Sequence, residues 1–143
     1  PNIIAPGKRP AHTLNAFTAV HPDGTLYLVG GTPGANIQVQ SNLQLLINVI
    51  DLKMNVQEAT EAPRWQHLNA PGQSSDEEKG LGVLEIENRV ATAVLDELRA
   101  KGHEVRPLAA WGHGSSVQLM EVLANGTFAF GSDPRCEGHA SGI

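Results

Sequence analysis

A glycine-rich segment, VGGTPGANIQVQ at residues 29–40, joins an apolar run to a turn and to the start of a predicted helix. Such a turn suits negative charge, because backbone N–H groups and the helix N-terminus point to the same place. Pro33 has no N–H and biases Thr32 towards an extended conformation. Gly34 and Ala35 would then offer two consecutive N–H groups, as a tetrahedral oxyanion requires. A tight turn without a ligand and an oxyanion-binding turn both fit this pattern.

Nucleotide and metal motifs fit the chain poorly. A dinucleotide fingerprint needs G-x-G-x-x-G, whereas the glycines here stand at positions 30, 31 and 34, and no lysine completes a P-loop. The six histidines show neither H-x-x-x-H nor H-E-x-x-H spacing. We therefore expect no metal ion and no cofactor.

Three further polar clusters could do chemistry. His12 and Thr13 stand at the entry to a predicted strand, where they could line a pocket or form a structural pair. The tail GSDPRCEGHASGI at 131–143 is dense in charge and glycine, which favours a structured loop over a catalytic centre. Ser115 and Ser116 lack the Gly-x-Ser-x-Gly context of a serine hydrolase.

The composition is that of a globular protein. The chain has 143 residues, of which 41% are hydrophobic, so one domain with a real core is expected. The net charge of −5 and the absence of a basic cluster argue against nucleic acid as a partner. The densest apolar stretch, residues 43–52, is too short and too polar to span a membrane. A single cysteine excludes an internal disulfide, and the compartment stays open.

The elements around the glycine-rich turn follow from local patterns. Strands at 12–20 and 25–30 flank turn chemistry at 21–24, which predicts a hairpin. After the turn, apolar residues recur at the i, i+3, i+4, i+7 spacing of an amphipathic helix, namely Leu43, Leu46, Ile47 and Ile50. A short helix at 55–63 has a capping pattern in Asn55 and Glu58.

The rest of the chain adds strands and one helix. Residues 64–68 are extended, and the polar segment 70–80 reads as an exposed loop. Strand patterns at 82–87 and 103–109 enclose a helix at 88–102. We expect Asn88 to cap that helix and Gly102 to end it.

A final hairpin, with strands at 116–123 and 127–133, turns at Asn125-Gly126. Hairpins combined with packing helices predict an α+β fold in layers.

Several motifs occur together and in order. They are PGKRP, GGTPGA, LQLLINVIDLKMNVQEATEAPRWQH, LRAKGHEV, GSSVQ and GSDPRCEGHASG. The sequence resembles the C-terminal part of the small subunit of gamma-glutamyltranspeptidases over essentially the whole chain. The resemblance implies that residues 1–143 are one incomplete domain of an N-terminal-nucleophile hydrolase with an αββα sandwich.

The resemblance also implies a mechanism. Such proteins are precursors that cut themselves, and the new N-terminal threonine of the small subunit becomes the nucleophile, with its own α-amine as base. That threonine is not in this chain, so the chain alone should be inactive. The partners would be the rest of the same precursor, namely the large subunit and the N-terminal part of the small subunit, together with a small amide substrate such as glutathione. Gly34 and Ala35 occupy the positions that supply the oxyanion N–H groups.

Two departures from the family pattern bear on substrate choice. Ala35 replaces a glycine, which preserves the backbone donor if the local φ suits alanine. His12 and Thr13 stand where typical members have the serines that hold the substrate α-carboxylate. This makes the chain similar to the transpeptidase-like amidases and acylases as well. Three alternatives follow, namely a γ-glutamyl enzyme, an amidase or acylase on another small amide, and a non-catalytic relative that keeps the fold.

Overall fold

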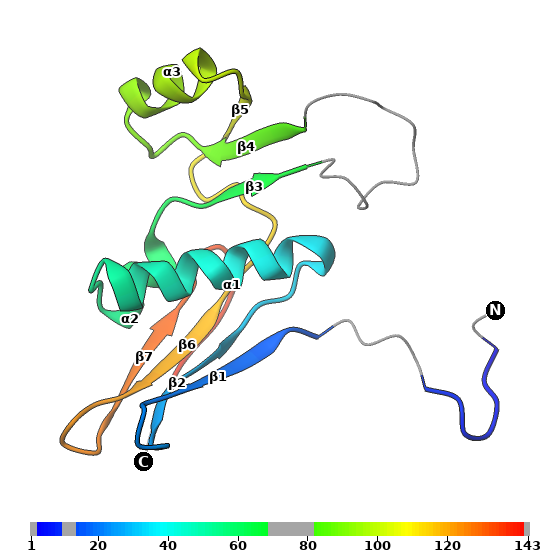
Figure 1. Ribbon diagram of the computed structural model, residues 1–143, viewed down its shortest axis with the longest axis vertical. Helices are drawn as coiled ribbons and strands as arrows, with labels where there is room; N and C mark the ends of the chain where they lie inside the picture. Colours follow the sequence, from blue (N-terminus) through cyan, green and yellow to red (C-terminus); the bar gives the residue numbers. More distant parts are fainter. Residues whose placement is uncertain (1–2, 10–13, 69–81, 142–143) are drawn as a thin grey trace.

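The computed structural model describes residues 3–9, 14–68 and 82–141, which form two sheets joined by helices (Figure 1). The four-stranded sheet has the order β1-β2-β6-β7 and is antiparallel throughout. Its strands are β1 (Ala16–Val20), β2 (Leu26–Gly31), β6 (Gln118–Val122) and β7 (Phe128–Ser132). The two predicted hairpins are thus confirmed, and they meet where β2 pairs with β6.

The two hairpin turns have the expected chemistry. The β1–β2 turn closes with hydrogen bonds between His21 and Thr25 and from Gly24 to His21, and Gly24 has a φ of 86°. The β6–β7 turn places Gly126 at a φ of 81°. Glycine adopts positive φ without the steric cost that a side chain adds. At the opposite end of the sheet from these turns, β2 leads into the glycine-rich segment.

One face of this sheet is covered by helices. The covering elements are η1 (Ala35–Ile37), α1 (Gln38–Leu46), a π-helical turn η2 (Ile47–Asp51) and α2 (Val56–Glu61). The core between helices and sheet consists of buried apolar side chains, namely Leu28, Leu45, Val49, Val56, Ala59, Val117 and Leu119. The predicted cap of α2 is confirmed, because Asn55 and Glu58 form a reciprocal capping box.

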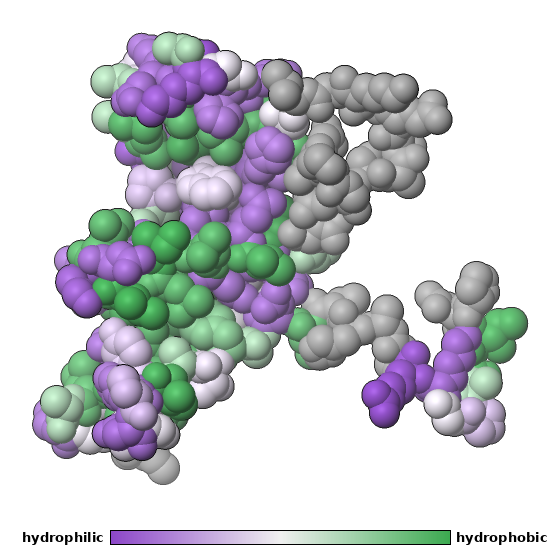
Figure 2. Space-filling model, viewed as in Figure 1, coloured by the Kyte–Doolittle hydropathy of each residue, from purple (hydrophilic) through white to green (hydrophobic). Residues whose placement is uncertain are grey.

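Of the apolar stripe of the predicted helix, only Leu46 packs against this core. Leu43 is 52% exposed, Ile47 40% and Ile50 38%, and Figure 2 shows hydrophobic side chains gathered over this helix. The inward positions of α1 instead hold polar side chains beside Leu45. The helix itself is confirmed, and only its orientation differs from what an amphipathic pattern indicates.

Hydrogen bonding explains why polar side chains of α1 face inward. Gln40 and Gln44 each pair through their side-chain amide with the backbone of β3 (Trp65–His67), accepting from an N–H and donating to a carbonyl. The four distances lie between 2.7 and 3.1 Å. The two glutamine side chains thereby supply the hydrogen bonds that a neighbouring strand would make to one edge of β3. Backbone groups withdrawn from water without a partner are costly, and these hydrogen bonds prevent that loss along β3.

The second sheet has the order β3-β4-β5, with β4 (Val83–Glu87), α3 (Thr92–Ala100) and β5 (Glu104–Leu108). β4 and β5 run parallel, and α3 makes the crossover between them. Gly102 ends α3 at a φ of 94°, as predicted. The prediction for Asn88 is wrong, because Ala91 is the N-cap and the Asn88 N–H bonds to the Leu108 carbonyl.

The described residues cover the other face of the larger sheet only in part, where residues 139–141 of the tail line a pocket with Met120 and Phe130. Val20, Phe128 and Phe130 are exposed on β1 and β7, while their neighbours in β7 pack towards the helices. One sheet with one helix layer is half of an αββα sandwich. The predicted loop at 70–80 lies outside the described residues. Among the helices of the described segments, none has the length and apolarity needed to cross a bilayer.

Candidate active site

The glycine-rich turn lies at the end of β2, beside the beginning of β6. Gly34 has a φ of 137° and Ala35 a φ of 47°, so two consecutive residues are in the left-handed region. Neither backbone N–H finds an acceptor among the described residues, and Ala35 is exposed. The turn therefore presents two adjacent N–H groups without an acceptor in the described part of the chain, at the start of the helical segment η1–α1. Their role as oxyanion donors stays a prediction.

Ala35 stores backbone strain in this turn, because a left-handed conformation costs an alanine roughly 1–2 kcal/mol. We expect Ala35→Gly to raise the free energy of unfolding by about 1 kcal/mol and to change kcat less than about twofold. Glycine relieves the strain and keeps the N–H.

Thermal unfolding and steady-state kinetics of the complete protein check both effects. Ala93→Gly is the matched control, because Ala93 is exposed within α3 and its replacement is expected to destabilise by about 0.5–1 kcal/mol. Destabilisation by Ala35→Gly of the same size would contradict a strained Ala35.

His12 and Thr13, the predicted substrate-binding residues, lie outside the described residues. The described chain resumes at Leu14, and Asn15 lies where β1 begins, next to Gly31 at the end of β2. The Asn42 amide of α1 donates to the Asn15 carbonyl at 2.8 Å. Asn15 thus lies at the same end of the sheet as the glycine-rich turn.

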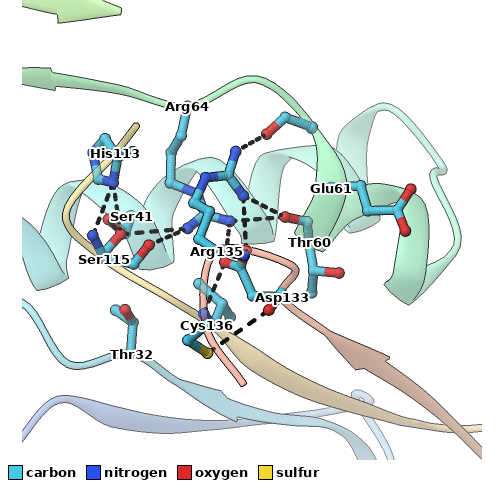
Figure 3. A network of polar contacts seen from close by, with 12 residues as sticks. Thr32, Ser41, Thr60, Glu61, Arg64, His113, Ser115, Asp133, Arg135 and Cys136 are labelled. Atoms are coloured by element: carbon cyan, nitrogen blue, oxygen red, sulfur yellow. Dashed lines mark hydrogen bonds and ion pairs between the residues drawn. The ribbon is translucent and has the colours of Figure 1, made fainter. Parts of the chain in front are cut away.

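A buried ionic cluster lies beneath this end of the sheet (Figure 3). Arg135 grips Glu87 with two hydrogen bonds of 2.6 Å and Asp133 with one of 2.9 Å. Arg64 pairs with Asp133 at 2.7 Å. Arg64 lies directly before β3, Glu87 ends β4, and Asp133 and Arg135 belong to the tail. The cluster therefore joins both sheets. The tail is thus a structured loop, as its composition predicts.

Arginine side chains hydrogen-bond to the C-terminus of α2. The carbonyls of Thr60, Glu61 and Ala62 have no partner within the helix and instead accept from guanidinium groups. The donors are Arg64, Arg89 and Arg135. Positive charge near a helix C-terminus also interacts favourably with the negative end of the helix dipole.

The electrostatics of the cluster hold Glu87 ionised. Burial alone would raise its pKa, but hydrogen bonds from Arg135, Arg89 and the Arg64 N–H outweigh burial and lower the pKa to about 2. The guanidinium of Arg89 also stacks on the Trp111 ring, 3.5 Å from its centroid. Trp111 takes a left-handed φ of 62° in that position.

A set of hydroxyl and imidazole groups connects the cluster to the glycine-rich turn. The Ser115 hydroxyl lies 2.8 Å from that of Ser41 and 2.9 Å from His113 Nδ1. Arg64 donates to the Ser115 carbonyl at 2.9 Å. Burial and the nearby Arg64 lower the pKa of His113 to about 4, so its imidazole is neutral at physiological pH.

Local sequence patterns did not reveal the pairings in this network. Glu87 and Ser115 belong to segments with no catalytic motif, and the pairs that join distant segments, such as Ser41–Ser115 and Glu87–Arg135, are 74 and 48 residues apart in sequence. The alternating pattern of β4 places Glu87 at a polar position, which predicts exposure, whereas the structure buries it fully. Among the described residues, no group of His, Cys, Asp and Glu could hold a metal ion.

The fold has close relatives among solved structures. The chain superposes on the gamma-glutamyltranspeptidase from Pseudomonas nitroreducens complexed with L-DON with a TM-score of 0.73 and 26% sequence identity. The alignment covers 99% of this chain and 68% of that one. The sheet and helix layer therefore define part of an N-terminal-nucleophile hydrolase, which confirms the predicted fold class.

The sequence matches the gamma-glutamyltranspeptidase family over residues 1–143, and the chain belongs to that family. It is 33% identical to a glutathione hydrolase proenzyme of Arthroderma benhamiae, over 94% of this chain and 21% of the relative. It is 36% identical to an oxamate amidohydrolase proenzyme of Klebsiella pneumoniae, over 97% of this chain and 25% of the relative. The chain thus spans about a fifth to a quarter of the length of these relatives.

Proposed function

We propose that this chain is part of a self-processing threonine-nucleophile hydrolase and transferase that acts on γ-glutamyl amides such as glutathione. The observation that carries the proposal is the pair of N–H groups on Gly34 and Ala35, which have no acceptor among the described residues and lie in a left-handed turn at the end of β2. The threonine hydroxyl attacks the amide carbonyl, and its proton passes through the α-amine to the leaving amine. Gly34 and Ala35 stabilise the oxyanion, and water or an acceptor amine then takes the acyl group.

The threonine and the rest of the site belong to the remainder of the same precursor in this proposal. Two open apolar surfaces support packing against that remainder. One is the outward stripe of α1, and the other is the face of the larger sheet that carries Phe128 and Phe130. Monomeric proteins rarely expose large contiguous apolar patches, so we expect the rest of the precursor to cover both surfaces. Residues 1–143 are then one incomplete domain of the complete protein.

An amidase or acylase acting on another small amide is the second candidate. His12 and Thr13 favour it, because they replace the serines expected to hold a glutamyl carboxylate. The similarity to a protein named as an oxamate amidohydrolase points the same way. A non-catalytic relative is the third candidate, and it would lack the processed threonine.

A substrate panel separates these candidates. The complete protein is incubated with a γ-glutamyl anilide, with oxamate and with simple acyl amides, and the start of each processed chain is sequenced. We expect a chain that begins with threonine and turnover of the γ-glutamyl anilide. Turnover of the other amides alone supports the second candidate. No turnover with an intact processed threonine contradicts both enzyme candidates.

Thr13 provides a test of substrate capture. We expect Thr13→Ala in the complete protein to raise KM by about 10-fold and to change kcat less, because one hydrogen bond to a charged group contributes about 1.5–3 kcal/mol. Thr92→Ala, on the exposed start of α3, is the matched control. Steady-state kinetics with the best amide of the panel measure both constants. An unchanged KM would mean that Thr13 does not hold substrate.

A further inference from the structure

We propose that Ser115 is a positioning residue: with His113 and Ser41 it holds the glycine-rich turn in the conformation that presents the Gly34 and Ala35 N–H groups. The inference rests on the proposed function of that turn. It concerns residues that touch no substrate and act through the backbone of the turn.

Ser115 packs directly against the turn. A Cβ atom placed on Gly34 would lie 3.3 Å from the Ser115 Cβ, so no side chain separates the two residues. The neighbouring Gly114 faces Ile37 of η1 in the same way, at 3.8 Å from its Cδ1 atom. The segment 113–115 is thus the surface on which the turn and the first residues of the helical segment rest.

The hydrogen bonds of Ser115 admit one consistent arrangement. The Ser115 N–H donates to His113 Nδ1 at 3.2 Å, which makes Nδ1 an acceptor and places the imidazole proton on Nε2, a buried atom with no hydrogen-bond partner among the described residues. The Ser115 hydroxyl therefore donates to Nδ1 and accepts from the Ser41 hydroxyl. Arg64 Nη1 lies 3.4 Å from the same oxygen and donates to the Ser115 carbonyl. Every hydrogen-bonding position of this hydroxyl is used, so its rotamer is fixed.

The residues that hydrogen-bond to Ser115 are themselves held in place by burial and pairing. Ser41 is fully buried on α1, and Arg64 is tied to Asp133. Asp133 in turn accepts from the Val117 N–H at 2.9 Å, two residues beyond Ser115. The ionic cluster therefore clamps the chain on both sides of Ser115. Rigid support of this kind is what a preorganised oxyanion site needs, because the donors must not reorient during the reaction.

The Ser115–His113 pair is not a second nucleophile. Ser115 is 1% exposed and His113 4% exposed, so no substrate carbonyl reaches the hydroxyl. Burial, Arg64 and Arg135 lower the pKa of His113 to about 4, and the nearby Glu87 carboxylate opposes this shift only in part. The imidazole stays neutral and keeps Nδ1 available as an acceptor above that pH.

The test is a set of variants of the complete protein, assayed with the best amide of the substrate panel. We expect Ser115→Ala to lower kcat by about 10-fold or more while KM stays within about twofold, since small misplacement of catalytic groups slows chemistry more than binding. Ser116→Ala is the matched control, because the Ser116 hydroxyl bonds to no described residue. Its kcat should equal that of the unmodified protein.

Two variants of His113 separate positioning from simple loss of packing. His113→Asn can keep an acceptor near the Nδ1 position and should retain most of kcat, whereas His113→Leu removes the acceptor and should resemble Ser115→Ala. Equal losses in the two His113 variants would overturn the role of the acceptor. If Ser115→Ala yields no soluble protein, Ser41→Ala, which removes one donor to Ser115, replaces it with the same expectation.

The outcomes distinguish this inference from the proposed function. An unchanged kcat in Ser115→Ala, together with a large loss of kcat in Gly34→Val, overturns the positioning role of Ser115. The same result supports the oxyanion site. An unchanged kcat in both variants overturns the oxyanion site, and the positioning role falls with it.

Discussion

Replacing Gly34 with valine is expected to lower kcat by about 100-fold or more, which is the usual effect of losing one oxyanion donor. Gly34 has a φ of 137°, a conformation that L side chains rarely adopt. A Cβ there would lie 2.8 Å from Ile37 Cγ1, too close for any real contact. The turn must therefore shift, and the Gly34 and Ala35 N–H groups leave the positions that the transition state requires.

Steady-state kinetics of the complete protein measure this effect, with Gly24→Val as the matched control. Gly24 also has a positive φ, at 86°, but no atom lies within 4 Å of an added Cβ, and its turn is at the far end of the sheet. The control shares the backbone strain and should keep kcat. If Gly34→Val retains full kcat, the oxyanion site lies elsewhere in the protein.

Glu87→Gln is expected to lower the free energy of unfolding by about 3–5 kcal/mol, the usual result of breaking a buried ion pair by removing one partner. The carboxylate accepts from Arg135, Arg89 and two backbone N–H groups, and it is fully buried. The glutamine keeps the shape but leaves the guanidinium groups of the cluster short of negative charge. Because α2 ends on these arginines, the end of that helix should loosen as well.

Thermal and urea unfolding of the complete protein measure the loss. Glu97→Gln is the control, because Glu97 forms an exposed i,i+4 pair with Lys101 on α3 that contributes no more than about 0.5 kcal/mol. The effect of Glu87→Gln should not depend on pH above about 4.5. Since the pKa of Glu87 is about 2 in the folded protein and 4.5 without its partners, its contribution disappears as the pH falls between these values. A loss no larger than that of Glu97→Gln would contradict the structural role of the cluster.

Local chemistry determined most of the elements from sequence. Both hairpins, the capping box of α2 and the glycine that ends α3 follow from residues within four positions of one another. The conformation of the glycine-rich turn also followed from neighbouring residues, because Pro33 and Gly34 restrict the backbone directly. The cap of α3 was missed because Asn88 bonds across to β5 instead.

The sequence by itself therefore determined the glycine-rich turn, the hairpins beside it and the resemblance to the family. Only the tertiary structure decided which side of α1 faces inward, because that depends on the unpaired edge of β3, 21 to 27 residues away along the chain. It also decided that Arg64, Glu87, Asp133 and Arg135 share one buried cluster and that Ser115 packs against Gly34. Such pairings arise when distant segments lose water together, and a buried charge then needs whichever partner the fold brings within reach.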